Sequence, residues 1–183
     1  MNGFDHLGRK MQKRSTGNET KQHARIRPIE RPDRSRIEAI IISSGKFTEE
    51  ERKTALELVD EALEKGEECG YIIRVLEVGK EQSVVQGYVC YGPTPLTQGV
   101  YDLYWIVTDP TVQGKGFGQR LMEYVERDIV KRGGRMLLIE TSSQETYAPT
   151  IRFYKRAGYE LAARIKNFYR IGDDKLVFLK ELT

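Results

Sequence analysis

Three glycines within five positions follow a strand-like run in this chain, in the stretch QGKGFGQ at residues 113–119. A helical pattern begins directly after them, in which apolar residues recur at steps of four: Phe117, Leu121, Val125 and Ile129. The first N–H groups of a helix have no partner inside the helix, and the helix dipole adds positive charge at that end. Glycines without Cβ let an anion approach those N–H groups closely. The segment therefore predicts a site for a phosphate or pyrophosphate.

The spacing of the glycines separates this segment from two common phosphate loops. A Walker loop needs G-x-x-x-x-G-K-[ST], whereas Lys115 stands between glycines with no Ser or Thr after it. A dinucleotide fingerprint needs G-x-G-x-x-G inside a βαβ unit. Here Gly114, Gly116 and Gly118 give G-x-G-x-G, and a hairpin pattern precedes the strand. The pattern therefore disfavours ATP and NAD as the bound molecule.

The remaining periodicities predict one α/β domain with a mixed sheet over residues 25–183, because neither a repeat nor a linker interrupts them. The predicted element order is β-α-α-β-β-β-α-β-α-β-β. Thr48 with Glu51 forms a capping box at the start of the second helix. Glycines end the four helices near residues 45, 66, 133 and 158.

Charge is concentrated at the N-terminus. Residues 1–24 carry five Lys or Arg against two Asp or Glu, so 5 − 2 = +3, which equals the formal net charge of the chain. The remainder has 25 basic and 25 acidic residues, which argues against nucleic acid as a partner. We interpret residues 1–24 as a basic polar tail exposed to solvent, although it leaves contact with an acidic partner open.

The residue types that are absent exclude several kinds of chemistry. Both histidines, His6 and His23, lie in the tail, so the domain cannot build a Ser-His-Asp or Cys-His system or a typical zinc site. No apolar run approaches the ~20 residues of a bilayer crossing, and no secretory signal pattern precedes the domain. Two cysteines form no disulfide framework. We expect a cytoplasmic protein without membrane association.

With its leading glutamine, the glycine segment resembles the Q/R-x-x-G-x-G/A signature of the GNAT superfamily of acyl-CoA-dependent N-acyltransferases: Gln113, Gly116 and Gly118. The run VTDPTVQGKGFGQRLM is similar to the acyl-CoA-binding strand, loop and helix of that family. TIRFYKRAGYE and NFYRIGDDKLVFLKEL resemble its last helix and last two strands. The resemblance covers residues 25–183. It implies a GNAT-like mixed, mostly antiparallel central sheet flanked by helices, and an N-acetyltransferase that uses acetyl-CoA as cosubstrate without a metal.

The same resemblance implies which residues hold coenzyme A. Backbone amides of the signature loop would bind its pyrophosphate: Gln113, Gly114, Lys115, Gly116, Phe117, Gly118 and Gln119. The preceding strand would pair its backbone with the pantetheine arm at Ile106 and Thr108. That strand and the strand ending at Thr141 should separate there to admit the arm.

Catalytic residues are also implied by the resemblance. Tyr154 matches a tyrosine near the sulfur of coenzyme A and is the candidate general acid, with an ordinary buried aromatic as the alternative. Asp102 stands where several members carry a glutamate that acts as the base. Glu140 is a second candidate base because, like Asp102, it is a carboxylate in a half-buried strand, which is costly unless it is used or paired; a salt bridge to an arginine is the alternative for either carboxylate. Strand alternation predicts Asp102, Tyr104, Ile106 and Thr108 on one face and Leu103, Trp105 and Val107 on the other.

The acceptor is the least constrained part. The resemblance places it between residues 42–51 and 170–175, where Glu49, Glu50, Asp173 and Asp174 would favour a cationic amine if they faced the cleft. Tyr147 stands where many members have asparagine, so Ser142, Ser143, Thr146 or Tyr147 would occupy that space. We expect a small-molecule amine or amino acid. A protein N-terminus or lysine, a silent acyl-CoA-binding module, and a homodimer all remain open.

Overall fold

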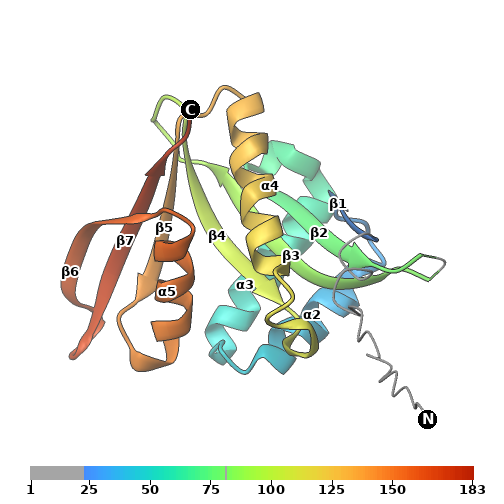
Figure 1. Cartoon of the computed structure of the whole chain (residues 1–183), viewed down its shortest axis with the longest axis horizontal. Coiled ribbons are helices and arrows are strands. Elements are labelled where there is room, and N and C mark those ends of the chain that lie inside the picture. The colour runs from blue at the N-terminus through green and yellow to red at the C-terminus, as the bar shows by residue number, and fades with distance from the viewer. Residues whose placement is uncertain (1–22, 81) are drawn as a thin grey trace, which may run out of the picture.

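The computed structural model describes residues 23–80 and 82–183 of the chain (Figure 1). Its strands are β1 (Ala24–Pro28), β2 (Ile72–Val78), β3 (Val84–Pro93), β4 (Val100–Thr108), β5 (Met136–Ser142), β6 (Glu160–Arg170) and β7 (Asp173–Glu181). Its α-helices are α2 (Asp33–Ser44), α3 (Glu49–Lys65), α4 (Phe117–Lys131) and α5 (Ala148–Arg156). This order confirms the predicted one. The predicted tail lies outside the described residues except for its last two, and β1 begins at Ala24.

The seven strands form one sheet in the order β1-β2-β3-β4-β5-β7-β6. Every neighbouring pair is antiparallel except β4 and β5, which are parallel. A parallel pair needs a crossover, and α4 provides it by connecting the end of β4 to the start of β5. The predicted mixed, mostly antiparallel sheet is therefore confirmed.

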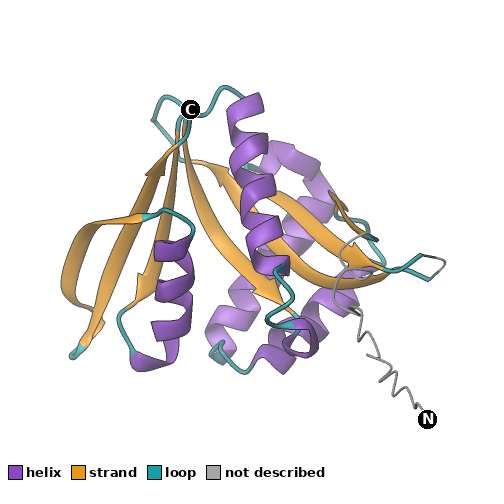
Figure 2. Ribbon diagram, in the orientation of Figure 1, coloured by secondary structure: helices purple, strands orange, loops and turns teal. Residues whose placement is uncertain are grey.

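Helices α4 and α5 cover one face of this sheet, and α2 and α3 cover the other (Figure 2). A hydrophobic core lies on each face. The first core lies under α4 and α5, and it contains the predicted apolar stripe of α4: Phe117, Leu121, Val125 and Ile129. The second core lies under α2 and α3, where Ile37, Ile40 and Val59 are completely buried. No helix among the described residues is both long and apolar enough to cross a bilayer.

The helix boundaries follow the predicted local chemistry. The Thr48 hydroxyl accepts a hydrogen bond from the Glu51 amide, and the Glu51 carboxylate accepts one from the Thr48 amide. Gly45 and Gly66, which follow α2 and α3, both have φ of +63°. A residue with a Cβ adopts such a positive φ at a cost, so glycine is the favoured residue after a helix.

A bulge in β4 makes the predicted face alternation wrong. Opposite Cys90 and Tyr91 of β3, the register jumps from Trp105 to Leu103, so Tyr104 is an extra residue. Leu103 and Ile106 both contribute to the first core, whereas Tyr104 and Trp105 both contact the second. Two consecutive aromatic side chains therefore lie on the face of α2 and α3, which strict alternation does not allow.

The β4 and β5 strands separate along their length. Their parallel pairing runs from Val100–Met136 to Leu103–Ile139 and then stops. Beyond it, β4 continues to Thr108 along β3, while β5 continues to Ser142 along β7. The two strands diverge visibly in Figure 1. The predicted separation of the strands that end near Thr108 and Thr141 is confirmed.

Candidate active site

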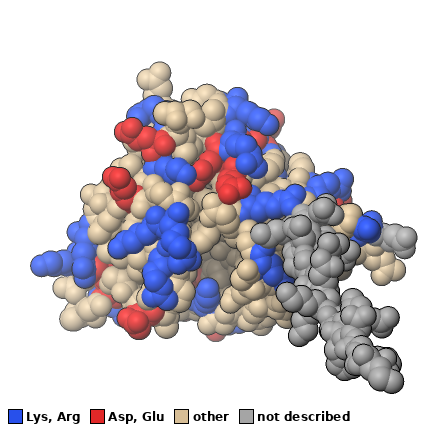
Figure 3. All heavy atoms as spheres, viewed as in Figure 1, with Lys and Arg blue, Asp and Glu red and all other residues tan. Residues whose placement is uncertain are grey.

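A cleft of about 1460 Å³ occupies the gap between β4 and β5. It is larger than the ~300–1,000 Å³ of a typical ligand pocket, so it has room for more than one small molecule. A hollow is visible near the middle of the face in Figure 3, and Lys and Arg side chains border it. All predicted cofactor and catalytic residues line the cleft except Lys115.

The glycine loop presents unpaired backbone amides at the start of α4. Gly114 and Gly116 have φ of +77° and +79°, and Gly116 is the N-cap residue. The first helical hydrogen bond runs from the Arg120 amide to the Gly116 carbonyl at 3.1 Å. Three amides therefore precede the internal ladder of the helix: those of Phe117, Gly118 and Gln119. This arrangement suits an anion.

The other residues of the loop have different roles in the structure. The amides of Gln113 and Lys115 donate long hydrogen bonds inside the loop, at 3.3 Å to Pro110 and 3.4 Å to Val112. The Phe117 side chain is buried in the first core and fixes the helix start to the sheet. The loop thus combines an exposed rim with one buried anchor.

An ion pair between Arg36 and Asp109, which the sequence did not predict, connects the glycine loop to α2. Asp109 accepts hydrogen bonds from the amide and hydroxyl of Thr111, at 2.8 and 2.6 Å. It also pairs with Arg36 of α2 at 2.6 Å, and Arg36 donates to the Val85 carbonyl. The Thr111 hydrogen bonds, together with Arg36, hold the pKa of Asp109 below its usual value. In the sequence, an Asp directly before Pro-Thr is typical of a turn in which the Asp side chain caps a backbone amide, and this pattern could have indicated the role of Asp109.

Beside the loop, the edge of β4 that faces β5 has no strand partner after Leu103 within residues 23–80 and 82–183. Ile106 and Thr108 lie on this free stretch and line the cleft. Because a strand edge presents N–H and C=O groups, an extended amide-containing chain can pair with it. The side chain of Ile106 packs against the first core and leaves the edge exposed to the cleft.

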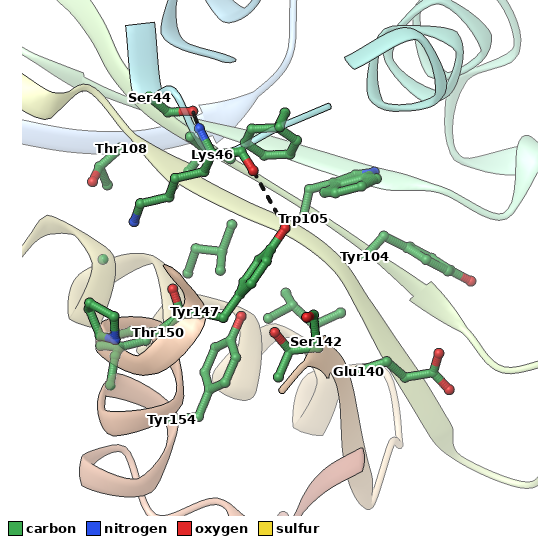
Figure 4. A pocket seen from close by; sticks show the side chains of 18 of the residues that line it. Ser44, Lys46, Tyr104, Trp105, Thr108, Glu140, Ser142, Tyr147, Thr150 and Tyr154 are labelled. Carbon is green, nitrogen blue, oxygen red and sulfur yellow. Dashed lines mark hydrogen bonds between the residues drawn. The ribbon is translucent and has the colours of Figure 1, made fainter. Parts of the chain in front are cut away.

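Tyr154 of α5 is buried, with 6% of its surface exposed. Its ring lies 5.6 Å from Phe153, 6.1 Å from Phe178 and 6.3 Å from Tyr159, centroid to centroid. Its hydroxyl points into the cleft next to Tyr147 (Figure 4). Burial, and to a smaller extent Tyr147, raises the pKa of the Tyr154 phenol, so the group carries its proton at neutral pH.

The two candidate bases have different surroundings. Asp102 is half-buried and accepts a 2.7 Å hydrogen bond from the Thr94 hydroxyl, which is a neutral partner. Glu140 is half-exposed, pairs with Lys175 at 2.5 Å, and points away from Tyr154 in Figure 4. An ion pair holds the Glu140 carboxylate, as the sequence alternative anticipated, although its partner is a lysine.

Tyr147 extends across the cleft from the turn before α5. Its hydroxyl lies 3.4 Å from the Lys46 carbonyl and 3.5 Å from Glu51 Oε1, on the opposite wall (Figure 4). Burial first, and then the charge of Glu51, raises the pKa of this phenol. Tyr147 therefore lies in the part of the cleft where the sequence predicted Ser142, Ser143, Thr146 or Tyr147. Ser142 and Thr146 also line the cleft, whereas Ser143 bonds to the Asp174 amide.

The four acidic residues considered for the acceptor are not brought together. Asp173 lines the cleft, but it accepts hydrogen bonds from Ser142 at 2.5 Å and Gln144 at 2.9 Å. Asp174 pairs with Arg164 at 2.5 Å. Glu49 and Glu50 lie exposed in the first turn of α3 and are not lining residues. Among the described residues, no group of three or more His, Cys, Asp and Glu could hold a metal.

Comparisons with known proteins agree with this geometry. A profile of the Acetyltransferase (GNAT) family matches residues 27–159. A crystal structure of a GNAT-family protein from Desulfovibrio desulfuricans is 43% identical, covers 87% of this chain and 99% of its own, and has a TM-score of 0.83. A comparison with functionally curated proteins gave no match.

More distant solved structures share the fold alone. An aminoglycoside 6'-N-acetyltransferase complexed with coenzyme A is 15% identical, covers 87% of this chain and 97% of its own, and has a TM-score of 0.66. The ribosomal-protein-S18-alanine N-acetyltransferase from Escherichia coli is 20% identical, covers 87% of this chain and 94% of its own, and has a TM-score of 0.64. The fold therefore accommodates both small-molecule and protein acceptors.

Proposed function

Because the chain belongs to the Acetyltransferase (GNAT) family, we propose that it transfers an acetyl group from acetyl-CoA to a primary amine. The separation of β4 and β5 is the observation that carries this proposal. The gap joins the amides at the start of α4, on one face, to the space next to α2 and α3, on the other. An anionic donor and an amine acceptor can therefore meet from opposite sides of the sheet. A small-molecule amine or amino acid is the proposed acceptor class.

The residues of the cleft fit the binding of coenzyme A. The amides of Phe117, Gly118 and Gln119 would hold the pyrophosphate, because they lack helical partners and the dipole of α4 favours negative charge there. The free edge of β4 at Ile106 and Thr108 would pair with the amides of the pantetheine arm. When bound, acetyl-CoA supplies an activated acetyl group as a thioester.

The reaction requires one bond to form and one to break. The neutral acceptor nitrogen attacks the carbonyl carbon, a C–N bond forms, and the C–S bond breaks. The proton lost by the nitrogen goes to Asp102, and the departing thiolate receives a proton from the Tyr154 hydroxyl. Tyr154 suits this role because burial keeps its phenol protonated. Backbone N–H groups on the free edge of β4 would stabilise the negative charge on the carbonyl oxygen.

Calorimetry with acetyl-CoA and a thiol-release assay over a panel of amines test the proposal. We expect binding in the micromolar range, typical of enzyme substrates, and release of free thiol only when an amine is present. Absence of acetyl-CoA binding would contradict the whole proposal. Binding without turnover of any small amine, peptide or lysine substrate would instead indicate a silent acyl-CoA-binding module. Turnover of peptides alone would indicate a protein acceptor.

Comparison of Asp102→Asn with Glu140→Gln tests which carboxylate is the base. We expect Asp102→Asn to lower kcat/KM about 100-fold, while Asn keeps an oxygen that accepts the Thr94 hydrogen bond. Glu140→Gln should lower kcat/KM no more than about fivefold, because a half-exposed ion pair contributes ~0–1 kcal/mol. Steady-state kinetics at saturating acetyl-CoA measures both. The reverse order would assign the base to Glu140.

A further inference from the structure

Four aromatic side chains gather on the wall of the cleft that belongs to the second core. We call Phe47, Tyr71, Tyr104 and Trp105 the aromatic corner, and all four line the cleft. The rings form two pairs, Phe47 with Trp105 at 5.2 Å and Tyr71 with Tyr104 at 5.3 Å between centroids. All four side chains are half-buried, so part of each remains accessible. The corner is therefore a partly open apolar wall.

The bulge in β4 creates this corner. In a regular strand Tyr104 and Trp105 would lie on opposite faces, but the extra residue brings both to the second core. Phe47 comes from the connection between α2 and α3, and Tyr71 immediately precedes β2. Three separate segments thus contribute rings to one wall.

The corner lies on the acceptor side of the cleft. The glycine loop begins α4, and Tyr154 belongs to α5, so both lie on the face of the first core. The aromatic corner belongs to the second core on the opposite face. In Figure 4, Tyr104 and Trp105 lie across the cleft from Tyr154. A molecule seated on these rings would therefore meet the donor's acetyl group from the side opposite to the pyrophosphate site.

The charge next to the corner fits a single amine. Asp102 lies two residues before Tyr104 on β4 and lines the same cleft. Burial, and to a smaller extent the charge of Asp102, raises the pKa of Tyr104 to about 12. Asp102 is hydrogen-bonded to the neutral Thr94 hydroxyl, so its charge is not cancelled by that partner. Aromatic faces and a nearby carboxylate together attract an ammonium group attached to an apolar body.

A polycation would find less complementary charge in this cleft. The acidic lining residues Glu51, Asp102, Glu140 and Asp173 are offset by the basic residues Lys46, Arg156 and Arg170. Glu140 is already paired with Lys175 at 2.5 Å, and Asp173 with Arg170 at 3.7 Å. The charges that remain are too few to recognise several ammonium groups at once.

We propose that the aromatic corner is the acceptor site for a primary amine that carries an aromatic ring, of the arylalkylamine class. This inference rests on the proposed acetyl transfer and specifies its acceptor. The ring of the substrate packs against Phe47 and Trp105, and its amine extends toward Asp102 and the gap between β4 and β5. The acetyl group is transferred from the thioester to that nitrogen as described above.

Two amines that differ only by a ring test the inference. We expect kcat/KM for 2-phenylethylamine to exceed that for ethylamine by about 10- to 100-fold, because only the first has a ring to bury in the corner. Thiol release at saturating acetyl-CoA measures both. Equal values for the two amines would overturn the inference. A preference for spermidine, for an aminoglycoside, or for a peptide N-terminus over 2-phenylethylamine would also overturn it.

A pair of phenylalanine variants locates the effect. Phe47→Ala should raise KM for 2-phenylethylamine about tenfold and leave KM for acetyl-CoA nearly unchanged, since Phe47 belongs to the corner. Phe153→Ala should do the opposite, because its ring lies 3.7 Å from where a Cβ on Gly118 would stand, next to the loop. If both variants changed the two KM values alike, the corner would have no specific role.

Trp105 also provides a readout that does not depend on turnover, because it is the only tryptophan of the chain. Titration of the protein loaded with coenzyme A should change the fluorescence of Trp105 with 2-phenylethylamine but not with ethylamine. This change without turnover would support the site and contradict the proposed enzyme. Turnover of 2-phenylethylamine without any change in Trp105 fluorescence would place the acceptor elsewhere and contradict the site.

Discussion

Replacing Gly116 with alanine is expected to weaken acetyl-CoA binding by about 10- to 100-fold. Gly116 has φ of +79° as the N-cap of α4, a conformation that costs a residue with a Cβ ~1–2 kcal/mol. Relief of this strain would turn the following amides away from a common anion, and a hydrogen bond to a charged group contributes ~1.5–3 kcal/mol. Calorimetric titration with acetyl-CoA measures the loss.

Gly133→Ala is the matched control for this substitution. Gly133 also has φ of +79°, and a Cβ there would meet no atom within 4 Å, so its backbone strain is comparable. It follows the opposite end of α4, away from the loop. Both variants should lose a similar free energy of unfolding, but only Gly116→Ala should lose acetyl-CoA affinity. Equal affinity losses would show that the loop does not hold the donor.

Tyr154→Phe is expected to lower kcat by about 100-fold or more while leaving the free energy of unfolding nearly unchanged. The substitution removes only the hydroxyl, which has no hydrogen-bond partner among the described residues, and keeps the ring contacts of the first core. Loss of a positioned general acid typically costs ~10²–10⁴ in rate. Single-turnover kinetics and thermal unfolding measure the two quantities.

Tyr159→Phe should show the opposite pattern. Tyr159 is also buried in the first core, but its hydroxyl donates to Glu126 at 3.0 Å. Its removal leaves a carboxylate oxygen short of a partner and should lower the free energy of unfolding by ~1–3 kcal/mol, with little effect on kcat. If Tyr154→Phe lost stability and kept its kcat, Tyr154 would be an ordinary core aromatic.

The raised pKa of Tyr154 also predicts how the rate of acetyl transfer depends on pH. Because burial raises this pKa above the ordinary tyrosine value, the phenol stays protonated throughout the neutral and moderately alkaline range. The rate should therefore rise with pH as the acceptor amine loses its proton, without an alkaline decline below about pH 10. A decline between pH 7 and 9 would point to a different acid.

The sequence predicted the parts of the molecule that depend on local chemistry. The capping box at Thr48 and the glycine loop are specified within a few residues, so spacing alone identifies them. The bulge at Tyr104 depends on how β3 pairs with β4, and nothing in the sequence near residue 104 signals it. The alternation rule consequently failed there, and the aromatic corner was not predicted.

Long-range pairing explains the other differences. Glu140 was a candidate base because of its position at a strand end, but its partner Lys175 lies on β7 and reaches it only through sheet formation. The Arg36–Asp109 pair likewise joins two segments that are far apart in the chain. The chemical nature of the residues could be read from the sequence, whereas their partners depended on the tertiary structure.

The separation of β4 from β5 also affects how the domain holds together. In the part of the chain that the structure describes, only four residue pairs, from Val100–Met136 to Leu103–Ile139, join the two halves of the sheet as strand neighbours. A donor whose amides pair with β4 would act as an extra, non-peptide strand at the open end. A ligand that binds the folded state but not the unfolded state stabilises the folded state by RT ln(1 + [L]/Kd), where [L] is the free ligand concentration. The lifetime of this protein in a cell would therefore rise and fall with the local concentration of acetyl-CoA.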